Sequence, residues 1–98
     1  MAADGTWNLT MTTPIGERKA TLEARSSGGK LEGKQAAEDG SAEIFDGTVD
    51  GDTVAWKVKI AQPMPMTLEF TATVDGNSMS GTMGTGMFGS FPFTGTRG

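Results

Sequence analysis

The feature of this chain that most constrains its fold is the strict alternation of apolar and polar residues in its second half. From Met66 to Val74 every second residue is apolar, and threonine or glutamate fills each position between. The segment from Val54 to Ile60 alternates with the same period. A period of two places successive side chains on opposite faces of an extended chain. Both segments therefore predict β-strands with one face in a core and the other in water.

Turn-forming residues divide the rest of the chain at similar intervals. Clusters of Gly, Pro, Asp, Asn and Ser recur about every dozen residues, which is typical of antiparallel hairpins rather than of strand–helix units. The clusters occupy residues 14–16, 27–29, 39–40, 50–52, 63–65, 75–77 and 84–89. They leave room for further strands at 18–25, 30–37 and 41–49, and we expect a bulge where Ile44 and Phe45 interrupt the alternation.

The two halves of the chain resemble each other. Trp7 and Trp56 lead matching segments 49 residues apart, and each is followed by a proline seven residues later. Several glycines also repeat at an offset of 48 or 49. We therefore expect two similar four-strand halves, residues 5–49 and 54–98, within one domain that covers residues 1–98.

A sheet of four antiparallel strands alone would leave its apolar face in water. Two such halves can cover each other by closing into a barrel, which also removes the unpaired edges of the sheet. We therefore predict an all-β fold, a single eight-stranded antiparallel up-and-down β-barrel. A β-sandwich, which buries the same alternating faces, is the rival architecture.

The two ends of the chain resemble those of a known superfamily. Gly5-Thr6-Trp7 opens the first predicted strand, and Arg97 ends the last. In these features the chain resembles the calycins, the up-and-down barrels that include lipocalins, fatty-acid-binding proteins and avidins. The resemblance implies that Arg97 packs on Trp7 and ties the first strand to the last. A cation over an indole would gain about 0.5–2 kcal/mol there.

The resemblance does not extend to a specific activity. The chain is shorter than lipocalins and avidins, and the avidin pattern of Ser, Tyr and Asp for biotin is not recognisable, so biotin binding is not expected. The chain also resembles small bacterial domains whose sequences contain GTW, TVDG and FTGTR in this order, a resemblance that implies no activity.

The residue types missing from the chain exclude several functions. Cysteine and histidine are absent, which removes thiolate and imidazole metal ligands, the thiol nucleophile and the commonest general base. We expect no catalysis, no cofactor and no metal, with an enzyme that uses carboxylates as the remaining catalytic alternative.

Charge and hydropathy exclude further partners. The net charge of −4 and the scattered Lys and Arg residues argue against nucleic acid. No run approaches the ~20 apolar residues of a membrane span. The first residues lack the pattern of a signal peptide, so we expect a cytoplasmic protein.

Two sequence motifs are better explained as turns than as sites. Residues 84–89 spell G-x-G-x-x-G, but a proline and strand-like alternation follow them instead of the helix that a dinucleotide site needs. Asp46, Asp50 and Asp52 lack the spacing and the bidentate Glu of an EF-hand calcium loop.

Three polar residues on the weaker strands could face either the core or water. An inward Glu43 would have its pKa raised by burial and could serve as a base or a ligand anchor. We expect Glu43 to lie in water instead, and Gln35 and Arg18 to be solvated or to cap the rim of the barrel.

The two ends of the predicted barrel differ in chemistry. A meander places alternate turns at opposite ends, so the short polar turns share one end and the methionine-rich turns the other. The candidate ligand-binding residues at the methionine-rich end are Ile15, Met64, Met66, Met87 and Phe88. Because thioethers are flexible and polarizable, we predict that this open end binds a small apolar molecule without catalysis.

The interior of the barrel can be hollow or filled. Small inward residues leave room for a ligand, namely Ala20, Ala24, Gly33, Ala72 and Gly81. The large inward residues, led by the two tryptophans, can instead fill an eight-stranded barrel. In that alternative the protein is a structural or protein-interaction module whose methionine-rich end contacts a partner. We expect a monomer or a weak homodimer.

Overall fold

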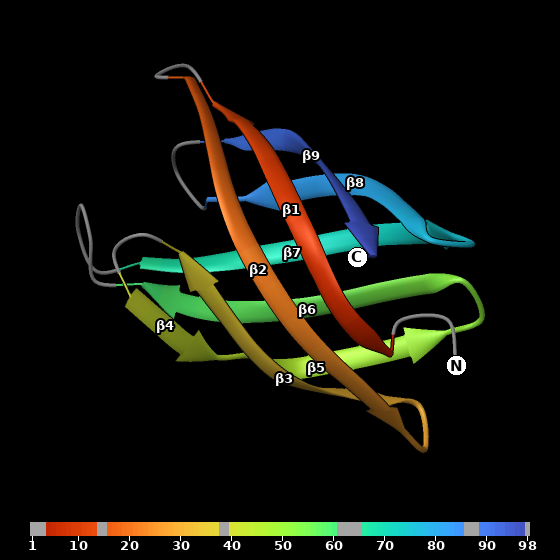
Figure 1. Cartoon of the computed structure of the whole chain (residues 1–98). Coiled ribbons are helices and arrows are strands. Elements are labelled where there is room, and N and C mark those ends of the chain that lie inside the picture. The colour runs from red at the N-terminus through yellow and green to blue at the C-terminus, as the bar shows by residue number, and fades with distance from the viewer. Residues whose placement is uncertain (1–3, 14–15, 38–39, 61–65, 86–88, 98) are drawn as a thin grey trace.

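The computed structural model describes residues 4–13, 16–37, 40–60, 66–85 and 89–97, with only the backbone described at Thr13, Ile60 and Met66. Within these ranges the chain forms nine β-strands, and no helix there is long and apolar enough to cross a membrane (Figure 1). The strands are β1 (Gly5–Thr13), β2 (Gly16–Ser27), β3 (Lys30–Ala37), β4 (Gly40–Glu43), β5 (Phe45–Asp50), β6 (Thr53–Ile60), β7 (Met66–Asp75), β8 (Ser78–Gly84) and β9 (Ser90–Arg97).

The sheet closes on itself. Neighbouring strands pair antiparallel in the order β1–β2–β3–β5–β6–β7–β8–β9, and β9 pairs back with β1, where Trp7 lies opposite Arg97. Strand β4 pairs with the second half of β3. In the described part of the chain the fold is thus a closed eight-stranded barrel with one extra strand. This confirms the predicted up-and-down barrel and excludes the sandwich.

The strand predicted at 41–49 is divided at Ile44 into β4 and β5. Asp46 has a positive φ of 51°, and the register of β5 against β6 shifts between Phe45 and Thr48. A bulge of this kind bends a strand and disrupts its ladder. The irregularity expected at Ile44 and Phe45 therefore occurs there, but it splits the strand, which sequence alternation did not predict.

The division leaves β4 beside β6 without a ladder. Some Cα atoms of the two strands lie within 8 Å of each other. Strand β6 pairs with β5 only as far as Lys57, and no backbone pair between described residues joins β6 to β4. We call the stretch between β4 and residues 58–59 of β6 the seam.

Aromatic rings fill the centre of the barrel. Trp56 stacks on Phe70 with ring centroids 5.0 Å apart, and Phe93 meets these two rings edge-on at 5.9 and 5.2 Å. Each such pair adds about 0.5–1.5 kcal/mol beyond the burial of its area. Around this cluster lie the other large buried side chains, namely Trp7, Leu9, Leu22, Met79, Val54 and Val58.

Two glycines let adjacent strands approach more closely than other residues would. Gly33 faces Ala24 across β2 and β3, and Gly81 faces Ala72 across β7 and β8. A Cβ atom at either glycine would overlap a carbonyl oxygen of the strand that it faces. Glycine kinks of this kind give a sheet the curvature that a closed barrel requires.

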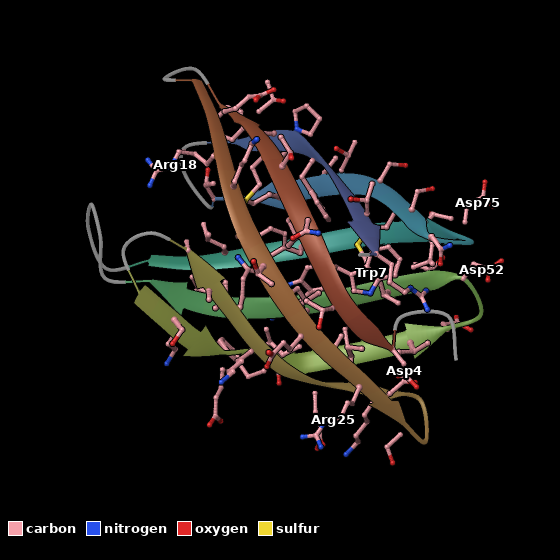
Figure 2. The ribbon with its side chains drawn as sticks, viewed as in Figure 1. Asp4, Trp7, Arg18, Arg25, Asp52 and Asp75 are labelled. Atoms are coloured by element: carbon pink, nitrogen blue, oxygen red, sulfur yellow. The ribbon has the colours of Figure 1, made fainter. Side chains whose placement is uncertain are left out.

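The two ends of the barrel can be followed in Figure 2. Asp52 and Asp75 lie at the end that carries short turns, and Arg18 lies at the opposite end. Strand β1 ends and β2 begins at the Arg18 side of the molecule. We refer to these as the Asp75 end and the Arg18 end.

Candidate functional site

At the Asp75 end, Trp7 and Arg97 form the contact that the calycin resemblance implies. The Arg97 guanidinium carbon lies 4.6 Å from the centroid of the Trp7 ring, and Trp7 is fully buried. Arg97 Nη2 also donates a hydrogen bond of 3.2 Å to the carbonyl oxygen of Gly76. The side chain of Arg97 thus connects β9, the indole of β1 and the turn after β7.

Asp4 ties the start of the first strand to the end of the second. Its Oδ1 accepts hydrogen bonds from the Ser26 backbone nitrogen at 2.6 Å and from the Ser26 hydroxyl at 2.8 Å. The hydroxyl bond, then the backbone bond, holds the pKa of Asp4 below its ordinary value. Together with the Arg97 contact, this makes the Asp75 end a structural closure.

The residues predicted to bind a ligand cannot be placed. Ile15, Met64, Met87 and Phe88 lie outside the described residues, and Met66 is described only by its backbone, which pairs with Ile60. The ligand site at these five residues therefore stays a prediction. The described inward residues at the same end of the barrel include Met11, Ala20, Leu68 and Met83.

The inward apolar side chains are buried at both ends of the barrel. At the Asp75 end, Trp7 and Val54 are 0% exposed. Toward the Arg18 end, four inward apolar residues keep 5–7% of their surface exposed, namely Met11, Ala20, Leu68 and Met83. The half-buried Phe91 packs against the same core. Val58, also toward the Arg18 end, is nonetheless 1% exposed, and Val74, toward the Asp75 end, is 4% exposed. The inward side chains are therefore buried at both ends, with a difference of only a few per cent between them.

Gln35 lies inside the barrel, so the expectation that it would be solvated or at the rim is wrong. Only 8% of its surface is exposed. Its Oε1 accepts a hydrogen bond of 3.1 Å from Trp56 Nε1. Because an indole nitrogen can only donate, the amide oxygen must be the atom that faces Trp56. The amide nitrogen then retains its two N–H donors, and in the described part of the chain it is not a buried atom left without a partner.

The sequence contained the signal for Gln35. Leu31 and Gly33 precede it at a spacing of two on β3, so alternation alone assigns Gln35 to their inward face. The opposite prediction rests on the tendency of polar residues to avoid a core, and here the alternation prevails. Glu43 and Arg18 are exposed, and the carboxylate of Glu43 has no desolvated environment in which to act as a base.

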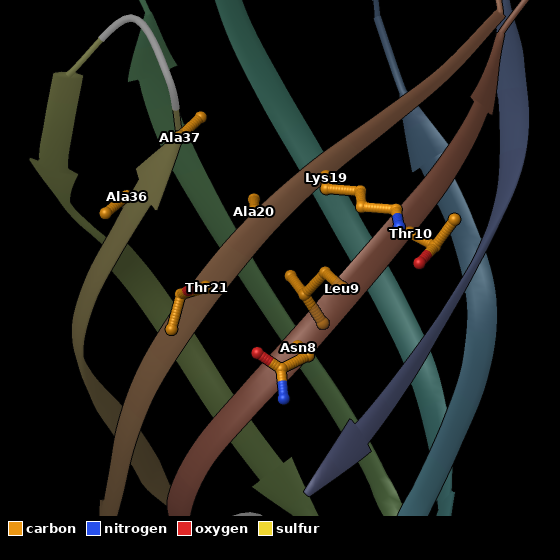
Figure 3. Close-up of a pocket in the computed structure, with 8 residues that line it drawn as sticks. All are labelled: Asn8, Leu9, Thr10, Lys19, Ala20, Thr21, Ala36 and Ala37. Carbon is orange, nitrogen blue, oxygen red and sulfur yellow. The ribbon is translucent and has the colours of Figure 1, made fainter. Parts of the chain in front are cut away.

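A depression of about 460 Å³ lies on the outer wall over β1, β2 and β3 (Figure 3). Figure 3 shows Lys19 reaching from β2 across β1 toward Thr10. Asn8, Thr21 and Ala36 face the same side of the sheet. Its lining is half polar and half apolar, and the apolar half consists of Leu9, Ala20, Ala36 and Ala37. The depression is open along the wall, unlike the enclosed apolar linings of most small-molecule sites.

A second depression, of about 870 Å³, lies on the outer wall over β1 to β4. Glu23, Lys34 and Glu43 lie opposite one another there in a row of alternating charge. Lys34 Nζ is 4.0 Å from Glu23 Oε2, and both side chains are about 60% exposed. Exposed pairs of this kind contribute roughly 0–1 kcal/mol. The row is therefore better explained as a solvated face than as a binding site.

The carboxylates do not assemble a metal site in the part of the chain that the structure describes. No three of its Asp and Glu residues lie where they could hold one metal ion together. Asp46 instead lies 3.8 Å from Lys57 Nζ, and the same lysine lies 3.6 Å from Glu69.

The closed antiparallel sheet defines the chain as a small β-barrel protein. A solved structure described as a redesigned β-barrel, b11L5F_LGL, is similar to it with a TM-score of 0.76. The match covers 97% of this chain and 90% of that chain at 20% sequence identity, and similarity at such an identity shows the fold alone. No family model and no curated protein matches the chain.

Proposed function

We propose that the protein binds one small apolar molecule without converting it, inside the barrel at the Arg18 end. The slightly greater exposure of four inward apolar side chains at that end supports this proposal. Met11, Ala20, Leu68 and Met83 each keep 5–7% of their surface exposed, and an apolar ligand there would remove that surface from water.

The chemistry of the described lining supports an apolar ligand. Met11 and Met83 supply flexible thioethers, and Phe91 supplies an aromatic ring. Ala20 supplies a small side chain, which leaves volume that a larger residue would occupy. The five predicted residues Ile15, Met64, Met66, Met87 and Phe88 would complete the mouth of this site.

The proposal includes a calycin-like ancestry and two repeated halves. The Trp7–Arg97 contact supports the first, because it matches the arrangement that the resemblance implies. The two glycine kinks support the second, because Gly33 and Gly81 are 48 residues apart and so are their facing alanines, Ala24 and Ala72.

Methyl-labelled methionine offers the most direct test. We expect saturable ¹³C-methyl shifts at Met11 and Met83 when a library of small hydrophobic molecules is added, and little change at Met79, which is 2% exposed and lies toward the Asp75 end. The absence of saturable shifts with every compound at millimolar concentration would contradict the proposal.

A pair of alanine variants separates the interior from the outer wall. Ala20 faces inward on β2 and Ala36 faces outward on β3. We expect Ala20→Leu to fill the site and weaken ligand binding at least tenfold, because the added isopropyl group competes for the same volume. Ala36→Leu is the matched control and should leave affinity unchanged. Because Ala20 and Ala36 both line the depression over β1, β2 and β3, equal effects of the two variants would place the ligand in that depression instead.

A filled structural or protein-interaction module is the second candidate. The stacked cluster of Trp56, Phe70 and Phe93 favours it, because these rings occupy the centre of the barrel and limit the depth of any cavity. Concentration-dependent dimerisation in sedimentation experiments, together with no ligand-induced methyl shifts, would support this candidate over the first.

A further inference from the structure

The charges on the outer wall of the barrel are unevenly distributed. On β2 and β3 most outward side chains are charged, among them Lys19, Glu23, Glu32 and Lys34. Among the described residues of β8, β9 and β1, which are neighbours in the sheet, no outward side chain is charged. These three strands present eleven outward side chains, nine of them with a hydroxyl group, and we call them the hydroxyl wall: Thr6, Asn8, Thr10, Thr12, Ser78, Ser80, Thr82, Ser90, Pro92, Thr94 and Thr96.

The hydroxyl groups form a continuous array across the three strands. β9 is the middle strand, and on it Thr94 pairs with Ser80 of β8 and with Thr10 of β1. Side chains that lie opposite each other in a sheet are about 4.5–5.5 Å apart at their Cβ atoms. Thr94 and Ser80 are exposed and Thr10 is half-buried, so the array faces solvent.

A surface of hydroxyl groups can form hydrogen bonds with a copy of itself. Each Ser or Thr hydroxyl both donates and accepts, whereas an ammonium group only donates and a carboxylate only accepts. A twofold dimer brings the same surface of both subunits together, so this surface must be complementary to itself. The hydroxyl wall therefore satisfies the chemical requirement of a twofold contact.

Covering this wall also costs less than covering the charged strands. Threonine has a single side-chain torsion between heavy atoms, and its branched Cβ already restricts that torsion, whereas Lys and Glu lose much more rotamer freedom when they are buried. Charged side chains would in addition lose their hydration, and the centres of protein–protein interfaces are depleted of them.

The net charge of the chain favours the same arrangement. Each copy carries a net charge of −4, so two copies repel each other when charged surfaces meet. Contact through the hydroxyl wall brings the uncharged strands of both copies together and directs the charged outer faces of β2 and β3 away. Of the described strands, β8, β9 and β1 therefore offer a second copy the most favourable approach.

We propose that the hydroxyl wall is the contact surface of a weak homodimer, with Thr94 of the middle strand nearest the twofold axis. A standard interface uses roughly 20–30 residues from each partner. The wall supplies eleven, so the dimer forms only at high protein concentration. The contact lies on the outside of the barrel, and it does not depend on whether the interior binds a ligand.

Threonine methyl groups test this contact in the wild-type protein. We expect the ¹³C-methyl signals of Thr10, Thr82 and Thr94 to shift as the protein concentration rises from micromolar to millimolar, and the signal of Thr48 on β5 to stay unchanged. Sedimentation equilibrium over the same range should show the mass rising toward that of a dimer. A protein that stays monomeric at millimolar concentration would overturn the proposal.

Two substitutions that add the same charge locate the contact. Thr94→Glu places a carboxylate in the middle of the hydroxyl wall, and Thr48→Glu places one at an exposed position opposite Lys30. We expect the Kd of the dimer to rise at least about tenfold in Thr94→Glu, because two like charges would meet near the axis, and less than about twofold in Thr48→Glu. Thermal unfolding establishes that both variants are folded.

Three results would contradict the hydroxyl wall as the dimer surface. Equal weakening by the two variants would assign the effect to net charge alone. Concentration-dependent shifts confined to Met11 and Met83 would place the contact at the Arg18 end. A monomeric protein whose Thr82 and Thr94 signals shift when dextran is added would make a neutral polysaccharide the occupant of the wall.

Discussion

At the scale of single residues, a few polar side chains hold the ends of the chain to the barrel. Arg97 covers the Trp7 indole and donates to Gly76, and Asp4 accepts two hydrogen bonds from Ser26. Both groups act at the Asp75 end. They hold the beginning and the end of the described chain to the barrel wall there.

Arg97→Ala is expected to lower the free energy of unfolding by about 2 kcal/mol, because it removes both the cation–π contact and one hydrogen bond. Urea denaturation followed by tryptophan fluorescence measures the change. Arg25→Ala, at an exposed position on β2, is the control and should alter stability by less than about 0.5 kcal/mol. Similar losses in the two variants would show that the indole contact contributes nothing.

Asp4→Asn is expected to destabilise the protein near pH 7 but not in acid. The Ser26 hydrogen bonds lower the pKa of Asp4 from its ordinary value of 3.8. Because the pKa is lower in the folded state, ionised Asp4 stabilises the fold at pH values above 3.8. This stabilisation is lost as the pH falls through the lowered pKa. Asn keeps a neutral acceptor, so the comparison isolates the charge.

Thermal unfolding at several pH values provides the measurement for Asp4. The difference in Tm between wild type and Asp4→Asn should be largest at neutral pH and should vanish at a pH well below 3.8. Asp75→Asn, at the exposed end of β7, is the control. A difference for Asp4 that stays constant across the pH range would contradict the role assigned to its charge.

At the scale of the strands, close approach between backbones determines which substitutions the barrel tolerates. Strand β8 carries two glycines that pair with β7. At Gly81 a Cβ atom would overlap the Thr71 carbonyl oxygen, whereas at Gly84 the nearest atom would be 3.7 Å away, an ordinary contact. Replacing Gly81 by alanine should therefore lower the stability of the protein, whereas replacing Gly84 by alanine should not.

Gly81→Ala is expected to cost about 3 kcal/mol or more of unfolding free energy, because β7 and β8 would have to separate. Gly84→Ala should be neutral or slightly stabilising, since it reduces the conformational entropy of the unfolded chain. Chemical denaturation of both variants tests the pair. Comparable stability of the two variants would show that the kink at Gly81 does not govern the curvature of the barrel.

The strands whose residues alternate between buried and exposed were the ones that the sequence predicted best. β6 and β7 alternate strictly, so their existence and inward faces followed from the sequence, and β3 was predicted with its observed bounds at residues 30–37. The split into β4 and β5 was not predictable. It depends on the positive φ of Asp46 and on a register shift against β6, which is a tertiary contact. Gln35 was missed because the tendency of polar residues to avoid a core was weighed above the alternation that places it on the inward face with Leu31.

At the scale of the whole molecule, closure and function are linked. The β1–β9 ladder turns the apolar face of every strand toward one interior, and the contacts at the Asp75 end seal that interior on one side. The aromatic cluster around Trp56 fills the centre. In the proposed function, an apolar ligand would lie at the Arg18 end beside Met11 and Met83.

The position of a bound ligand tests this account most directly. Intermolecular NOEs between the protein and a small apolar molecule selected from the hydrophobic library, measured at saturating ligand, distinguish the interior from the outer wall. The account predicts NOEs to the methyl groups of Met11, Leu68 and Met83, and none to Thr21 or Ala36. NOEs confined to Thr21, Ala36 and their neighbours on the outer wall would contradict it.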